Sequence, residues 1–334
     1  MIYRIHYKRK DCFVVELLAM TNAYMKFKTA LVTGGAGFIG SHLVDALVAK
    51  RVKVYVVDDL SSGQKSNVNP NASFTKLSVN APAFIDYLKK VKPEVIFHLA
   101  AQINVRKSVE NPLEDAKTNI MGLLTILSVA KEIGVKKIVF SSSGGVMYPD
   151  TAKMPYAETI PAEPISPYGI SKRTSEMYLS FAHKLHGMPY VALRYANVFG
   201  PRQNAKGEAG VVSIFTTLML AGKPVLINGT GKQTRDFVYV GDIVRANLLA
   251  AQKNVVGEFN IGTGRETDVN TLFKKLAKLT EYKLPEQHAK PAAGEVMRSV
   301  LDARKAGKML DWEPKTQFEE GLAKTVEWFK KKQK

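Results

Sequence analysis

Tyr168 and Lys172 are the residues of this sequence whose types and spacing most directly suggest acid–base chemistry. They stand four positions apart in a stretch from Pro167 to His186 that predicts a helix, so their side chains share one face. A lysine near a phenol favours the phenolate, and we therefore expect Lys172 to lower the pKa of Tyr168 from about 10. A tyrosine tuned in this way can act as a base near neutral pH.

Ser143 could complete this group, because its hydroxyl follows closely on a predicted strand, Lys136 to Phe140. A hydroxyl at a strand end can hold the substrate oxygen that gains or loses a proton. A tyrosine and a lysine at this spacing are, however, also typical of an exposed helix with an aromatic–lysine contact. The elements around them must decide between the two interpretations.

Those elements begin with a glycine-rich stretch between a predicted strand, residues 29–33, and a predicted helix, residues 41–50. Gly35, Gly37 and Gly40 fit the pattern G-x-G-x-x-G, in which glycines give a tight turn, room for a pyrophosphate and close helix packing. The helix N-terminus offers N–H groups to the phosphates. A lone glycine pattern is weak, because such clusters often form simple turns.

The next predicted strand, Val52 to Val57, strengthens the pattern because it ends in Asp58 and Asp59, roughly 20 residues after the glycines. Asp58 is placed to accept hydrogen bonds from both ribose hydroxyls and to repel a 2′-phosphate, which favours NAD over NADP. A bound nicotinamide cation would lower the pKa of Tyr168 further. The first strand, the glycines, the following helix and the acidic residue after the second strand together predict a binding site for a dinucleotide.

Strands and helices alternate up to about residue 198, which is typical of an α/β fold with a doubly wound parallel (Rossmann) sheet. Further helices and strands are expected at residues 83–91, 94–99, 113–133 and 190–193. We expect an N-terminal extension over residues 1–25, and an NAD-binding domain over residues 26–198 with returning segments near 236–262. Ligands bind beyond the carboxyl ends of such strands.

The second part of the chain predicts a smaller, mixed α/β substrate-binding domain, residues 199–235 and 263–334. Prolines mark residues 284–295 as coil. The elements expected after residue 199 are a strand at 238–240 and helices at 211–220, 242–251, 270–279, 303–310 and 318–331.

The composition of the chain limits the kinds of molecule that it is expected to bind. The 334 residues carry a net charge of +18 and a single cysteine, which excludes an internal disulfide and fits a reducing, cytoplasmic location. The basic residues are dispersed, without zinc-ligand spacing or a nucleic-acid-binding motif, and no apolar run is long enough to cross a bilayer. We expect no metal, nucleic acid or membrane, and interpret the lysines as a solvated surface that attracts anionic substrates.

Short motifs lie at residues 34–40, 58–61, 98–101, 141–143, 168–172, 194–202 and 235–240. Together they resemble the extended short-chain dehydrogenase/reductase superfamily and, within it, the UDP-glucose (UDP-galactose) 4-epimerase family. The resemblance implies a bound NAD and a UDP-sugar substrate. It also implies that Tyr168 takes the proton of the sugar's 4-hydroxyl while a hydride passes to NAD, and returns it once the 4-keto sugar has rotated.

The resemblance also assigns roles to individual residues, with Ser143, Tyr168 and Lys172 as the catalytic group. The implied NAD-binding residues are Gly34, Gly37, Phe38, Ile39, Gly40, Asp58, Leu60, Ser61, Leu99, Ala100, Ala101, Asn119, Ser141, Tyr168, Lys172 and Tyr195. The implied substrate-binding residues are Ser143, Asn197, Val212, Arg235, Glu295, Arg298 and Ser299. Relatives often contact adenine with an aspartate after the third strand, but residues 76–80 contain none.

Two positions narrow the expected reaction. Related dehydratases and decarboxylases carry an acid after the serine, where this chain has Gly144 and Gly145, so epimerisation without elimination is expected. A small residue at Ser299 implies that N-acetylated UDP-hexoses fit. The alternatives are another nucleotide-sugar epimerase or reductase of the superfamily, or a non-catalytic NAD-binding sensor. The resemblance implies a homodimer through the helices at 113–133 and 167–186.

Overall fold

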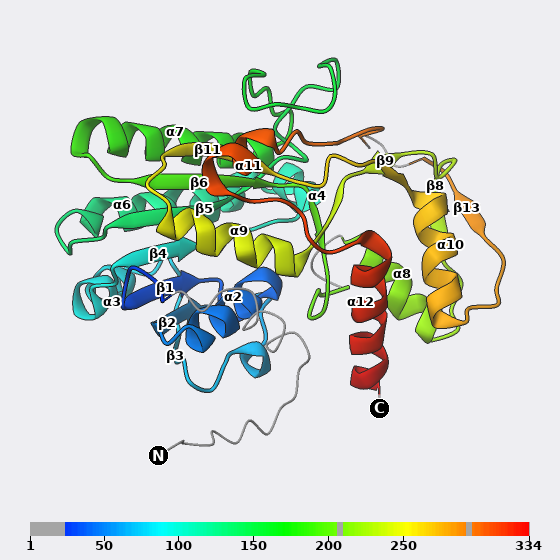
Figure 1. The fold of residues 1–334 in the computed structure, drawn as a ribbon, viewed down its shortest axis with the longest axis horizontal. Coiled ribbons are helices and arrows are strands. Elements are labelled where there is room, and N and C mark those ends of the chain that lie inside the picture. Colours follow the sequence, from blue (N-terminus) through cyan, green and yellow to red (C-terminus); the bar gives the residue numbers. More distant parts are fainter. Residues whose placement is uncertain (1–23, 206–209, 292–295, 334) are drawn as a thin grey trace.

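A seven-stranded parallel sheet forms the centre of the computed structural model, which describes residues 24–205, 210–291 and 296–333 (Figure 1). The strand order is β11-β6-β5-β4-β1-β2-β3. The strands are β1 (Thr29–Thr33), β2 (Lys53–Asp58), β3 (Ser73–Lys76), β4 (Val95–His98), β5 (Lys137–Ser143), β6 (Tyr190–Tyr195) and β11 (Gly257–Ile261). This order, with all neighbours parallel, confirms the expected doubly wound α/β fold.

Helices cover both faces of this sheet. The neighbours Leu31 and Val32 on β1 belong to different buried clusters, because successive strand side chains point to opposite faces. Val32 packs in the cluster that contains residues of α2 (Phe38–Ala49) and α9 (Val240–Gln252). Leu31 packs in the cluster formed with α3 (Ala83–Val91), α6 (Gly122–Ala130) and α7 (Pro167–His186).

The helix expected at residues 113–133 is present but interrupted. It consists of α5 (Pro112–Ala116), a π-helical turn η2 (Lys117–Met121) and α6, and it follows a short helix α4 (Val105–Glu110) that the sequence did not predict. Each of α4 and α5 begins at an asparagine whose side chain accepts a backbone N–H bond, which explains the two starts. A π-helical turn inside a helix is common at functional sites.

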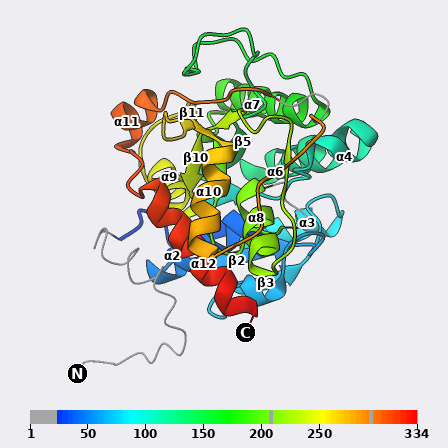
Figure 2. The same ribbon diagram turned by 90° about the vertical axis from the view of Figure 1, so that its right-hand side faces the viewer.

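Three further helices, α8 (Val211–Leu220), α10 (Val269–Thr280) and α12 (Phe318–Gln333), stand beside the sheet in Figure 1 and lie next to one another in Figure 2. They share one buried cluster, and we call them the small helical unit. The prediction of coil at residues 284–295 is wrong for Gln287–Ala289, which form the strand β13. This strand is polar and lacks apolar alternation, and its backbone pairs with that of β8 (Leu226–Asn228). The other short elements are β7 (Asn197–Phe199), β9 (Thr234–Arg235), β10 (Phe237–Tyr239), β12 (Thr267–Asp268), η1 (Lys65–Asn67) and α11 (Arg304–Leu310).

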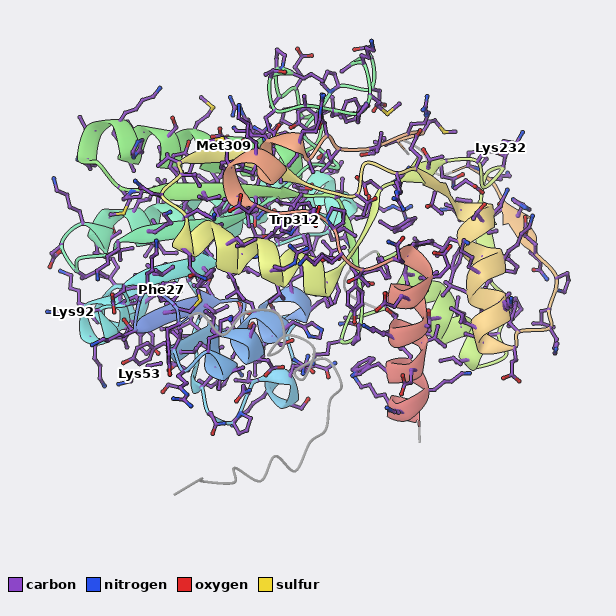
Figure 3. All side chains as sticks on the ribbon, viewed as in Figure 1. Phe27, Lys53, Lys92, Lys232, Met309 and Trp312 are labelled. Carbon is purple, nitrogen blue, oxygen red and sulfur yellow. The ribbon has the colours of Figure 1, made fainter. Side chains whose placement is uncertain are left out.

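The surface carries much of the basic charge. Lys53, Lys92 and Lys232 are exposed and lie at the periphery of the molecule, whereas Trp312 is buried beside α9 and donates its indole N–H to Asp242 O at 2.9 Å (Figure 3). Within the described residues, no helix is both long and apolar enough to cross a membrane.

Candidate functional site

The loop between β1 and α2 is closed around its glycines. Gly34 has a φ of +71°, and a Cβ there would lie 2.8 Å from the backbone nitrogen of Ala100. A Cβ at Gly40 would lie 2.2 Å from the carbonyl oxygen of Gly34. The helix begins at Phe38 with Gly37 as its N-cap and no side-chain cap, so the first-turn N–H groups form a cradle for an anion.

Asp58 joins this loop to the turn after β2. Its Oδ2 accepts a hydrogen bond from Ala36 N at 3.0 Å, and its Oδ1 accepts one from Leu60 N at 2.8 Å. Burial raises the pKa of Asp58, and these two backbone donors act in the opposite direction. The carboxylate is therefore fixed beside the glycine loop, at the place where a ribose of NAD is expected.

A cavity opens at this edge of the sheet, beyond the carboxyl ends of β1, β2 and β4. Its walls include the expected residues Gly34, Gly37, Asp58, Ser61, Ala100 and Ala101. They also include residues that the sequence reasoning missed, among them Ser78, Asn80, Glu114, Lys117 and Thr118. Ser78 and Asn80 directly follow β3, so their place at a strand end was a signal that could have found them.

The donors and acceptors of this cavity fit NAD. The glycine loop and the first turn of α2 would hold the pyrophosphate, and Asp58 would hold the adenosine ribose. Ser78 and Asn80 supply polar groups where the expected adenine-binding aspartate is missing. This close approach of the backbone requires glycine at positions 34 and 40, because a Cβ at either position would overlap neighbouring backbone atoms.

The helix α7 brings the three predicted catalytic residues together. Its start is fixed because the side chain of Ser166 caps it, accepting from Gly169 N at 3.2 Å. Tyr168 hydrogen-bonds with the side chain of Ser143 at the end of β5. Lys172 donates from Nζ to the carbonyl oxygen of Ser141 at 2.8 Å, and Nζ lies 5.8 Å from the ring centre of Tyr168.

The expected lowering of the pKa of Tyr168 is not found in the structure. Burial raises the pKa of Tyr168 to about 12, and its hydrogen bond with Ser143 lowers it only in part. Burial also lowers the pKa of Lys172 to about 8, which weakens the positive charge that was expected to act on the phenol. The spacing in the sequence predicts that the two side chains lie close together, but it carries no information about how deeply they are buried from solvent.

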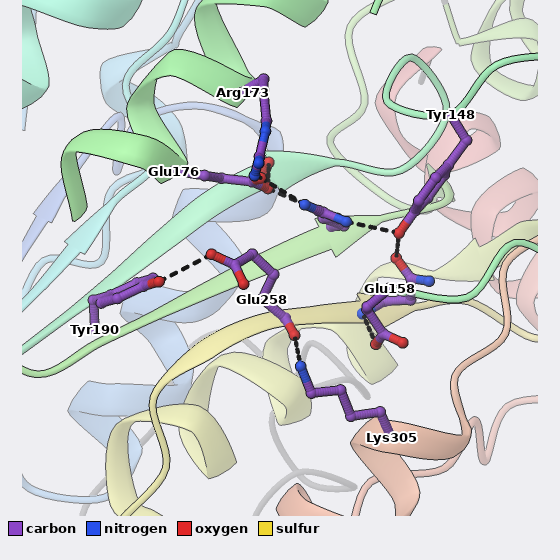
Figure 4. A network of polar contacts seen from close by, with 10 residues as sticks. Tyr148, Glu158, Arg173, Glu176, Tyr190, Glu258 and Lys305 are labelled. Carbon is purple, nitrogen blue, oxygen red and sulfur yellow. Dashed lines mark hydrogen bonds and ion pairs between the residues drawn. The ribbon is translucent and has the colours of Figure 1, made fainter. Parts of the chain in front are cut away.

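A buried ionic network holds the same helix against the sheet (Figure 4). Arg194 on β6 donates to both carboxylate oxygens of Glu176 on α7, at 2.9 and 2.7 Å. Arg194 also donates to the hydroxyl of Tyr148 at 2.8 Å, and the hydroxyl of Ser142 donates to Glu176 at 2.7 Å. The strand end that carries Ser143 is therefore tied directly to the helix that carries Tyr168.

A second cavity, of about 530 Å³, lies between the sheet edge and the small helical unit. Its volume is in the range of sites for small organic ligands. Asn197, Val212 and Arg235, which were expected to bind substrate, all line it. Asn197 Oδ1 lies 4.0 Å from the position of a Cβ built on Gly145, which places this cavity next to the segment after Ser143.

Not all of the predicted substrate residues are brought to that cavity. Arg298 is bound to Glu266 through two hydrogen bonds, at 2.9 and 2.6 Å, so a diphosphate would have to compete with a carboxylate for its guanidinium. Ser299 is buried, next to Val300, whose carbonyl accepts from Tyr156 N at 2.9 Å. Glu295 lies outside the described residues, as do residues 1–23 of the expected extension.

Some predicted NAD-binding residues support the site from inside the protein. The Asn119 amide is buried and bonds to the backbone of Gln102 and to Asp115, and the Tyr195 hydroxyl pairs with Asn247. Phe38 and Ile39 pack in the apolar clusters that join α2 to its neighbours. The backbone groups of Leu60, Leu99 and Ser141 hold the surrounding loops and Lys172.

Comparisons with known proteins agree with this arrangement. The family model described as "NAD dependent epimerase/dehydratase family" matches residues 30–262. A putative UDP-glucose 4-epimerase of Methanocaldococcus jannaschii is 45% identical over 301 residues, which cover 90% of this chain and 98% of that protein.

Two solved structures are similar along most of their length. The UDP-glucose 4-epimerase of Thermotoga maritima, solved with UDP-glucose, has a TM-score of 0.90 and 51% identity, over 92% of this chain and 100% of that chain. A UDP-N-acetylglucosamine 4-epimerase of Methanobrevibacter ruminantium, in complex with UDP-N-acetylmuramic acid, has a TM-score of 0.87 and 37% identity, over 92% and 100%.

Proposed function

This chain belongs to the NAD dependent epimerase/dehydratase family, and we propose that it interconverts UDP-glucose and UDP-galactose by NAD-dependent 4-epimerisation. One observation carries the proposal: Tyr168 and Lys172 meet Ser143 at the carboxyl end of β5, which neighbours β4 on the sheet edge where the dinucleotide cavity opens. The adjacent cavity that contains Asn197 and Arg235 offers an amide and a guanidinium to a nucleotide diphosphate.

The reaction needs a group that both accepts and returns a proton at one oxygen of the sugar. Tyr168 takes the proton of the 4-hydroxyl as C4 loses its hydride, and the Ser143 hydroxyl holds the oxygen of the resulting 4-keto sugar. When bound, NAD supplies the hydride acceptor and donor for C4. After the keto sugar rotates, Tyr168 returns the proton, so that protons and electrons balance over one turnover.

Lys172 stabilises the charge that develops on Tyr168. Its ammonium group is buried, held by the Ser141 carbonyl, and 5.8 Å from the ring centre of the phenol, so it acts through a medium of low dielectric constant. Epimerisation rather than elimination fits the segment after Ser143, where a side chain at Gly144 would collide with Leu301 at 2.4 Å. An acidic residue at position 144 would require the side chain of Leu301 to move.

The finer parts of the proposal concern substrate range, organisation and location. We propose that N-acetylated UDP-hexoses are also substrates, that the reaction serves galactose metabolism, and that the single cysteine marks a cytoplasmic enzyme. We also propose that residues 199–235 and 263–334 bind the sugar nucleotide. A homodimer is proposed because α7 exposes Ile170, Met177, Phe181 and Leu185 at helical spacing.

Replacing Tyr168 by phenylalanine tests the mechanism directly. We expect Tyr168→Phe to lower kcat for interconversion of UDP-glucose and UDP-galactose by about 10²–10⁴-fold, because it removes the proton acceptor and little volume. NAD should still co-purify, as measured by mass spectrometry. The matched control is Tyr178→Phe, the same change on a more exposed face of α7.

The alternative of a non-catalytic sensor is tested in the same experiment. An enzyme should show a transient absorbance of reduced cofactor when a UDP-sugar is added to the wild-type protein, whereas a sensor should show none. Full interconversion activity in Tyr168→Phe would contradict the mechanism.

A further inference from the structure

Asp115 on α5 is a buried carboxylate that the proposed mechanism does not use. It is 1% exposed, although it lies close to the catalytic face of α7. Ser171, between Tyr168 and Lys172 on that helix, donates to Asp115 Oδ2 at 2.6 Å. Tyr168, Ser171 and Lys172 are at positions i, i+3 and i+4, so the carboxylate faces the turn that presents both catalytic side chains.

The hydrogen-bond partners of Asp115 side-chain oxygens are all uncharged in the described part of the chain. Besides Ser171, they are Gln102 Nε2 at 2.9 Å and Asn119 Nδ2 at 3.0 Å, both on Oδ1. The charge of a buried carboxylate is stabilised by hydrogen-bond donors and, more strongly, by a nearby positive charge. Lys172 is 3% exposed, and the charge of Asp115 acts on both Lys172 and Tyr168.

Two other titratable groups act on or are acted on by Lys172, namely Glu176 and His98. Glu176, one turn beyond Lys172, is neutralised by Arg194 from β6 at 2.7 Å and by Arg173 at 3.2 Å. His98 from β4 bonds to Thr33 Oγ1 at 2.8 Å, and burial lowers its pKa to about 3, so it is neutral. Asp115 and Glu176 both favour the protonated form of Lys172, but Glu176 shares its charge with two arginines, whereas the hydrogen-bond partners of Asp115 in the described residues are uncharged. Asp115 is therefore the carboxylate available to balance Lys172.

We propose that Asp115 is the buried counter-ion of Lys172 and acts as a positioning residue that sets the pH range in which the Tyr168–Lys172 pair works. The part of this inference that concerns pH rests on the proposed function. A pair that works as a base must have lost one proton but not both, and its two apparent pKa values belong to the pair. A neighbouring negative charge raises both values, because it favours each more protonated form.

The first test is a double-mutant cycle that needs no activity. Asp115→Asn keeps the size of the side chain and removes its charge, and Lys172→Met removes the cation. We expect Asp115→Asn to lower the free energy of unfolding in the wild type and to be much less costly, or stabilising, in the Lys172→Met background. Equal costs in both backgrounds, measured by urea unfolding, would overturn the proposal whatever the activity of the protein.

The second test is the pH dependence of kcat/KM for UDP-galactose. Asp115→Asn should move both limbs of the profile to lower pH by about 1 pH unit, whereas a purely structural role would lower the rate without moving them. The matched control, Glu110→Gln, removes one negative charge from an exposed position on α4 and should move neither limb. Limbs that stay in place would overturn the proposal. Coupling in the cycle without any epimerase activity would instead contradict the proposed function alone.

Discussion

Ser299 is a single residue through which the proposed substrate range can be tested. Its side chain is 5% exposed, in the segment whose backbone pairs with Tyr156. We expect the wild type to turn over both UDP-GlcNAc and UDP-glucose. If Ser299 lies beside the sugar as proposed, Ser299→Tyr should lower kcat/KM for UDP-GlcNAc at least about tenfold more than for UDP-glucose, because the added ring would take the space of the N-acetyl group.

The control for this prediction is Ser299→Ala, which keeps the side chain small and should keep the ratio of the two rates near that of the wild type. Both rates can be followed by separating the epimeric UDP-sugars chromatographically. Absence of UDP-GlcNAc turnover in the wild type would show that a small residue at position 299 is insufficient.

Residue types and spacing in the sequence were enough to predict that Tyr168 and Lys172 lie together, because they stand on one turn of a helix. They could not predict the bond between Ser171 and Asp115, which joins positions 56 residues apart. The direction of the pKa shift of Tyr168 was also wrong, since burial is a property of the folded chain. For the same reason Arg298 was expected on a phosphate, while the structure pairs it with Glu266.

At the scale of elements, the pair between Arg194 on β6 and Glu176 on α7 fixes the helix that carries Tyr168 and Lys172. Arg194→Met would leave Glu176 buried without its main partner, and we expect the free energy of unfolding to fall by about 3–5 kcal/mol. Glu176→Leu combined with Arg194→Met should recover most of this loss, because the buried charge is removed as well. A single-variant loss below about 0.5 kcal/mol in urea unfolding would contradict this assignment.

Elements were predictable where their pattern is strong. Apolar positions at helical spacing predicted α8 at the observed residues 211–220, and the run of residues 29–33 predicted β1. The pattern failed for β13, where three polar or small residues pair through the backbone, and for the π-helical turn η2 within an otherwise regular helix. Backbone pairing between distant segments leaves no periodic signal in the sequence.

At the scale of the whole molecule, α7 presents an exposed apolar surface made by Ile170, Met177, Phe181 and Leu185, which are 49, 58, 54 and 62% exposed. Successive positions are about seven, four and four residues apart, which is one or two helical turns, so these side chains lie along one stripe of the helix. A second copy of the chain, packing its own α7 on this stripe, would bury it on both partners. The proposed homodimer explains why so many large apolar side chains share this face.

Light scattering after gel filtration tests this proposal. The wild type should have about twice the mass of one 36.9 kDa chain, whereas Phe181→Glu should be shifted towards the monomer, because a carboxylate buried in an apolar interface without a partner costs several kcal/mol. Leu284→Glu is the matched control, since it adds the same charge to another exposed apolar position, after α10 of the small helical unit. If the wild type is monomeric at micromolar concentration, or if both variants dissociate alike, α7 is not the contact between copies.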